Sequence, residues 1–138
     1  MSAVLPTGTR GARWTGHILA GAAILALLVD AGVSIFAPQL MANDLARTGF
    51  AIALSPVIGG VLLACLVLYA IPRTSVLGAI LLTGFLGGAI CTHMRIGEMG
   101  SPPQIVSAVL GIAVWASLYL RLDAVRALLP LTGLSGAR

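Results

Sequence analysis

Residues 14–36 read WTGHILAGAAILALLVDAGVSIF, an apolar run that a single charged residue, Asp30, interrupts. At a rise of about 1.5 Å per residue, a helix over this run is long enough to cross the roughly 30 Å hydrocarbon core of a bilayer. Pro38 predicts the end of that helix, because proline lacks an amide hydrogen and disfavours a helical conformation in the residue before it. We therefore predict a transmembrane helix over this stretch.

Three further apolar runs follow along the chain, at about residues 49–71, 74–95 and 104–120. Most are longer than a barrel strand of about ten residues, and none alternates between apolar and polar positions. Helices and closed barrels are the only structures that satisfy the backbone within lipid. The sequence therefore predicts an all-α fold, an integral membrane bundle of four antiparallel transmembrane helices.

The segments between the runs are short. Their lengths are about 12, 2 and 10 residues, and prolines and glycines mark the breaks. The first, at residues 37–48, is expected to be a loop, and a short amphipathic segment at residues 122–129 follows the fourth run. No connection has room for a second domain, so residues 1–138 are expected to form one four-helix transmembrane domain.

The composition excludes an ordinary soluble domain. Of the 138 residues, 59% are hydrophobic and 9% are charged, against roughly 45–50% and about 25% in soluble globular domains. The net charge of +4 comes from single arginines between the apolar runs. Such scattered charges do not form the basic stripe of a nucleic-acid-binding surface. We therefore expect the lipid bilayer, and no nucleic acid, as a partner.

The arginines also predict the orientation. One side of the expected bundle collects Arg10, Arg13, Arg73, Arg121, Arg126 and Arg138, and the other collects Arg47 and Arg95. Cytoplasmic segments carry the excess of positive charge, so both termini are expected to be cytoplasmic. All eight basic residues are arginines, which hints at a GC-rich bacterial genome. The expected location is a bacterial inner membrane.

A recognisable pattern surrounds the third run. It consists of LYAIPRT at residues 68–74, LGAILLTG at residues 77–84, LGGA at residues 86–89 and THMRIG at residues 92–97. Together with WTG at residues 14–16, Asp30 and the closing Trp115 and LYLR at residues 118–121, it covers about residues 14–130. Through these segments the chain resembles the DoxX-like family. One departure is Ser34, which stands where the family often has a lysine.

The resemblance implies two functions from different classes. Some relatives are associated with quinone-linked redox or oxidative-stress systems, and others with the assembly of membrane partners. The first function is a subunit or accessory of such a redox system, with no intrinsic cofactor and with a bound quinone or similar lipophilic ligand. The second is a non-enzymatic membrane factor that stabilises a membrane or redox protein partner. Neither is an established activity of the family fold itself.

Asp30 is the sharpest candidate for a functional residue. It lies roughly 7–8 Å beyond the middle of its predicted helix, on the expected outer side. A carboxylate at this depth costs several kcal/mol, so it should face the bundle interior. Its helical face carries small residues, namely Gly16, Ala23, Ala26, Ser34 and Ala37. The residue is either a proton-carrying or ligand-binding carboxylate or a structural polar contact to a neighbouring helix.

The end of the third run supplies two more candidates. His93 is either a group that hydrogen-bonds a quinone or relays protons, or an interfacial histidine at the level of the headgroups. A stripe of small residues, Gly84, Gly87, Gly88 and Cys91, predicts close packing against another helix and leads to Arg95. We expect Arg95 to form an ion pair with Asp30 at the polar centre of the site.

The cysteines and histidines do not suggest a metal site. Cys91 and His93 are two residues apart and fall on opposite helical faces, and no cluster has metal-ligand spacing. Cys65 and Cys91 are expected to differ in depth by roughly 18 Å, well beyond the reach of a disulfide. Both are predicted to be free thiols that fill space between helices.

Overall fold

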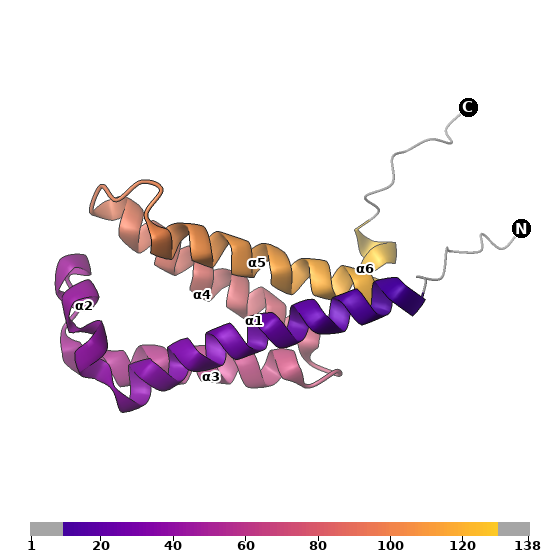
Figure 1. Cartoon of the computed structure of the whole chain (residues 1–138), viewed down its shortest axis with the longest axis horizontal. Helices are drawn as coiled ribbons and strands as arrows, with labels where there is room; N and C mark the ends of the chain where they lie inside the picture. The colour runs from indigo at the N-terminus through magenta and orange to yellow at the C-terminus, as the bar shows by residue number, and fades with distance from the viewer. Residues whose placement is uncertain (1–9, 130–138) are drawn as a thin grey trace, which may run out of the picture.

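The computed structural model describes residues 10–129, and these fold into a bundle of helices (Figure 1). Its long helices are α1 (Arg10–Phe36), α3 (Ser55–Ala70), α4 (Ser75–Arg95) and α5 (Pro102–Arg121). Each is long and apolar enough to cross a membrane, with the single-turn η2 (Ile52–Leu54) extending α3. The predicted all-α fold of four antiparallel candidate membrane spans is confirmed.

The bounds of the helices follow the prolines and glycines of the sequence. Pro102 and Pro103 open α5, where the missing amide hydrogens are not needed. Pro56 lies in the first turn of α3, which is why the predicted second helix begins as the separate turn η2. The amphipathic segment after α5 forms the short helix α6 (Asp123–Leu128).

The connection after α1 differs from the expected loop. It contains the turn η1 (Pro38–Met41) and the helix α2 (Ala42–Thr48). Gly49 ends α2 with a left-handed φ of 79°, a conformation that glycine adopts without strain. The negative charge of Asp44 in the first turn and the positive charge of Arg47 in the last turn interact favourably with the helix dipole and stabilise α2. The prediction of a loop was wrong because it rested on the proline alone.

The four long helices form a ring. In this ring α1 packs against α3 and α5, and α4 packs against the same two helices, so α1 and α4 lie across from each other. Figure 1 shows the pair α1 and α3 diverging from the pair α4 and α5 toward the end where α2 lies. We call this the α2 end. The opposite end, where α1 begins and α5 ends, is the terminal end.

The core is small and tightly packed near the terminal end. Its fully buried side chains include Leu27, Leu62, Tyr69, Leu82 and Leu118. Large apolar side chains on the outer faces are exposed, among them Leu25 at 65% and Ile112 at 70%. This is the distribution expected of helices that face lipid tails.

Helices approach one another most closely at three glycines, Gly16, Gly59 and Gly78. A Cβ at Gly16 would lie 3.0 Å from the carbonyl oxygen of Ser117 in α5, and one at Gly59 would lie 2.9 Å from that of Ala31 in α1. A Cβ at Gly78 would lie 2.2 Å from the backbone nitrogen of Tyr69. These glycines let backbones meet without an intervening side chain.

The predicted small-residue stripe does not pack. Gly84 and Gly88 are exposed and Gly87 is half-buried, and a Cβ at any of the three would have no neighbour within 4 Å. The predicted close packing against another helix is not made by any helix within residues 10–129, because the face of α4 that enters the core carries Gly78, Ala79, Leu82 and Leu86 instead. Cys65 and Cys91 are both free, as predicted. Cys65 is buried and fills space between helices, whereas Cys91 is exposed, so the predicted packing role is wrong for Cys91.

Candidate functional site

A cavity of about 380 Å³ lies at the α2 end, between the diverging helix pairs and beneath α2. We call it the wedge cavity. Its polar lining consists of Asp30, Ser34, Asp44, Thr48, Ser55, Thr92 and His93. Its apolar lining consists of Met41, Leu45, Phe50, Ile58, Phe85, Gly88 and Ala89. The cavity therefore brings together Asp30 of α1 and His93 of α4, two of the three residues that the sequence singled out.

Asp30 lines the wedge cavity from α1. Its side chain is exposed, and its carboxylate forms no hydrogen bond or ion pair with any residue between positions 10 and 129. A carboxylate at membrane depth is costly unless another group interacts with it. The carboxylate is therefore available to a molecule that enters the cavity.

His93 lines the cavity from α4 and belongs to a chain of polar contacts. Its Nδ1 lies 2.8 Å from a carboxylate oxygen of Glu98, and the other oxygen of Glu98 contacts the guanidinium of Arg47. Arg47 in turn lies 3.9 Å from the carboxylate of Asp44. The side chains of His93 and Glu98 are only 14% and 21% exposed. This series of contacts connects α4 and the α4–α5 loop to α2 across the open side of the wedge cavity.

Arg95 makes a second contact across the same open side. Its guanidinium donates a hydrogen bond to the carbonyl of Thr48 and lies against Gly49, where α2 ends. The carbonyls at a helix C-terminus carry partial negative charge and attract a cation. Arg95 is thus a residue that holds α2 in place, and it does not line the wedge cavity.

The expected ion pair between Asp30 and Arg95 is not present. No contact within 4.0 Å joins a carboxylate oxygen of Asp30 to a guanidinium nitrogen of Arg95, both of which the structure describes. The prediction was wrong for two reasons. The two residues lie on helices across the ring, and α2, which was expected to be a loop, presents its carbonyls closer to Arg95.

A double-mutant cycle measures whether the side chains of Asp30 and Arg95 interact. We expect Arg95→Gln to lower stability by about 1.5–3 kcal/mol, the usual range for a lost hydrogen bond to a charged group. Asp30→Asn should be neutral or stabilising, because it removes a charge and breaks no contact. The two effects should add within about 0.5 kcal/mol in thermal unfolding in detergent. A larger coupling would mean that the two side chains interact after all.

Three hydroxyl groups of the cavity lining donate hydrogen bonds to the backbone. Thr48 donates to the carbonyl of Asp44 at 2.7 Å, Ser55 to that of Ser34 at 2.9 Å, and Thr92 to that of Gly88 at 2.8 Å. Sequence reasoning missed these residues and Glu98. Nothing in their spacing places them together, because they come from four separate segments that only the tertiary fold brings to the wedge cavity or, for Glu98, into contact with its His93.

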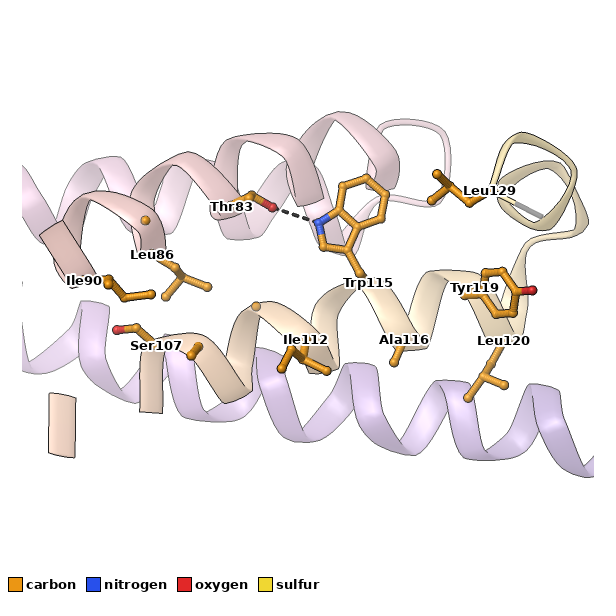
Figure 2. Close-up of a pocket in the computed structure, with 13 residues that line it drawn as sticks. Thr83, Leu86, Ile90, Ser107, Ile112, Trp115, Ala116, Tyr119, Leu120 and Leu129 are labelled. Atoms are coloured by element: carbon orange, nitrogen blue, oxygen red, sulfur yellow. Dashed lines mark hydrogen bonds between the residues drawn. The ribbon is translucent and has the colours of Figure 1, made fainter. Parts of the chain in front are cut away.

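A second cavity, of about 670 Å³, is a groove between α4 and α5. Figure 2 shows Trp115 of α5 in this groove, with its indole nitrogen directed at the hydroxyl of Thr83 on α4, 2.8 Å away. The rest of the lining is almost wholly apolar, with Leu86, Ile90 and Ile112 as its larger side chains. Among the described residues that line this α4–α5 groove, Tyr119 is the only titratable one, so the groove offers little chemistry.

The histidine, cysteine and acidic side chains do not cluster elsewhere. Within residues 10–129, no group of three or more of them is placed to hold a metal ion. The wedge cavity, with the carboxylates of Asp30 and Asp44 and the imidazole of His93 in its lining, is therefore the candidate functional site.

Comparison with known proteins places the chain in a family. The DoxX-like family matches residues 18–117, well over half of the chain, and this range contains Asp30, His93 and every residue of the wedge cavity. The chain matches no curated protein and no solved structure. The match confirms the resemblance predicted from the sequence. With its four apolar, antiparallel helices, the chain belongs to the DoxX-like family as a multi-pass membrane protein.

Proposed function

We propose that the wedge cavity binds the ring of a quinone, and that the chain is a quinone-binding subunit or accessory of a membrane redox system. The observation that supports this proposal is the placement of Asp30 and His93 in one cavity between membrane-spanning helices. A ligand that reaches such a cavity from the bilayer must be lipophilic, yet it must carry polar groups that match a carboxylate and an imidazole. A quinone meets both conditions in its reduced form, whose two hydroxyls can donate hydrogen bonds to a carboxylate and an imidazole.

The size and the lining of the cavity support the same ligand class. Pockets for small molecules usually measure about 300–1,000 Å³ and combine an apolar wall with a few placed polar groups. At about 380 Å³, the wedge cavity is near the lower end of this range, which suits a single ring. Phe50, Ile58 and Phe85 supply apolar surface for the ring, and the quinone tail would extend into lipid.

The proposed role of the chain is to bind and to exchange protons. A carboxylate and an imidazole can each take part in proton transfer, and neither can store electrons. Electron transfer is therefore assigned to a protein partner that carries the redox centre. The chain would present the quinone to this partner and hold the ring while protons move.

Binding of a soluble quinone analogue tests the proposal. Purified protein in mild detergent should bind decylubiquinone, and mass spectrometry of a lipid extract should find a co-purifying quinone. We expect His93→Gln to weaken binding of the reduced analogue, decylubiquinol, by about tenfold, because its hydroxyl loses the hydrogen bond that it donates to the imidazole. His17→Gln is the matched control, because His17 is exposed near the terminal end, far along α1 from the cavity. Equal binding by both variants would contradict the proposal.

A second function, stabilisation of a protein partner, has its own supporting observation. Gly84, Gly87 and Gly88 lie along one face of α4 with no neighbour within 4 Å of an added Cβ. Small residues on a lipid-facing helix allow another helix to approach closely. A photoreactive amino acid at position 84 should then form an adduct with a membrane protein. Adducts with lipid alone would count against this second function.

We also propose that the protein lies in a bacterial inner membrane with both termini in the cytoplasm. Five arginines lie at the terminal end, at positions 10, 13, 73, 121 and 126. Arg47 and Arg95 lie at the α2 end, where Asp44 and Glu98 offset them. Reporters fused to either terminus should give cytoplasmic signals. A periplasmic signal from either fusion would contradict the proposed orientation.

A further inference from the structure

The inference rests on the proposed quinone site. We propose that this site binds the hydroquinone form more tightly than the quinone form, and that Glu98 is the positioning residue that sets this preference through His93. The preference follows from which groups in the wedge cavity can donate a hydrogen bond and which can only accept one.

Glu98 determines which nitrogen of His93 carries the proton. Its carboxylate lies between the guanidinium of Arg47 and Nδ1 of His93, the latter at 2.8 Å. A carboxylate paired with a guanidinium is ionised and only accepts hydrogen bonds. Nδ1 of His93 must therefore be the donor. In the neutral imidazole the proton then sits on Nδ1, and Nε2 presents a lone pair.

The hydroxyl groups of the cavity point to the same chemistry. Three lining hydroxyls, those of Thr48, Ser55 and Thr92, donate their hydrogen bonds to backbone carbonyls. They can therefore only accept a hydrogen bond from a ligand. Asp30, when ionised, also only accepts. Among the lining hydroxyls that the structure describes, Ser34 has no backbone acceptor and can donate or accept. The cavity is therefore rich in acceptors and poor in donors.

An acceptor-rich cavity discriminates between the two redox forms of a quinone. The carbonyl oxygens of a quinone can only accept hydrogen bonds, whereas the hydroxyls of a hydroquinone donate. A quinone carbonyl that faces Nε2 of His93 would remain unpaired, and an unpaired polar group in a desolvated site is costly. One such difference corresponds to about a tenfold preference for the hydroquinone.

The first test is the tautomer of His93. The two histidines of the chain, His17 and His93, can be labelled with ¹⁵N, and His17→Gln assigns the signals. We expect a protonated Nδ1 and a bare Nε2 at His93. Glu98→Gln should shift the population toward the other tautomer, because an amide can donate as well as accept. An Nε2-protonated ring in the unaltered protein would overturn the inference.

The second test compares decylubiquinone with its hydroquinone under argon, in mildly alkaline buffer. The unaltered protein should bind the hydroquinone about tenfold more tightly. Glu98→Gln should reduce the preference to within about twofold, because the tautomer is no longer fixed. Arg47→Gln is the matched control, since it breaks the same ion pair and the contact to α2 but leaves the carboxylate of Glu98 in place.

The outcomes separate this inference from the function on which it rests. Binding of both forms with equal affinity would overturn the preference and leave the quinone site standing. Binding of neither form would overturn both. If Arg47→Gln lost the preference as fully as Glu98→Gln, the effect would come from the docking of α2, and the assignment of Glu98 as the positioning residue would be overturned.

Discussion

Replacing Gly78 with alanine should destabilise the protein more than the same change at any other glycine between positions 10 and 129. The added Cβ would lie 2.2 Å from the backbone nitrogen of Tyr69, 2.4 Å from its Cα and 2.7 Å from the carbonyl carbon of Leu68. These are backbone atoms, so no rotation of a side chain can relieve the overlap, and α3 and α4 must separate. Overpacking of this kind typically costs about 1–3 kcal/mol and sometimes more, and we expect a value at or above the upper end.

The expected separation of α3 and α4 would also disturb the core. Tyr69 is 2% exposed, and its hydroxyl contacts Ser117 and donates to the carbonyl of Val114 in α5. Thermal unfolding in detergent, followed by tryptophan fluorescence, measures the loss. Gly84→Ala is the matched control on the same helix, since an added Cβ there meets nothing within 4 Å. The control should be neutral or stabilising by about 0.5–1 kcal/mol, because alanine favours a helix. Equal stability of the two variants would contradict the packing described for Gly78.

Replacing Gly88 with phenylalanine should block the wedge cavity without unfolding the protein. Gly88 lines the cavity, and an added Cβ would have no neighbour within 4 Å. The bulky ring therefore has room to fold into the space that the proposed ligand needs. We expect affinity for decylubiquinone to fall roughly tenfold to a hundredfold, since crowding an occupied cavity costs about 1–3 kcal/mol.

Gly84→Phe provides the control for this effect. Gly84 lies about one turn earlier on α4, is exposed and does not line the wedge cavity. Both variants place the same aromatic ring on the same helix, so non-specific effects on the membrane-facing surface should be equal. Retention of full affinity by Gly88→Phe would show that the ligand binds elsewhere.

The four membrane spans could be predicted from the sequence, because each one must be apolar and helical whatever its neighbours are. Each apolar run satisfies its own backbone hydrogen bonds as a helix, and prolines such as Pro38 and Pro102 mark the ends. The family resemblance was also accessible, since the segments that carry it are local. Asp30 and His93 stood out because polar residues are rare in such runs, and the structure places both in one cavity.

The contacts between helices could not be predicted in the same way. The stripe of Gly84, Gly87 and Gly88 has the spacing of a packing face, but exposed and buried small residues look alike in a sequence. The choice of Arg95 as the partner of Asp30 assumed that α1 and α4 are neighbours, and the ring places them across from each other. Glu98 escaped notice because its role depends on α2, a helix that the apolar pattern did not indicate.

The most direct measurement of the central claim is photolabelling with an azido-substituted quinone. The purified protein would be irradiated with this probe, digested and mapped by mass spectrometry, with excess decylubiquinone as competitor. The wedge cavity predicts competed adducts on α4 between Phe85 and His93 and on α1 near Asp30 and Ser34. Competed adducts confined to the α4–α5 groove, around Ile112 and Trp115, or labelling that decylubiquinone does not compete, would contradict a quinone site in the wedge cavity.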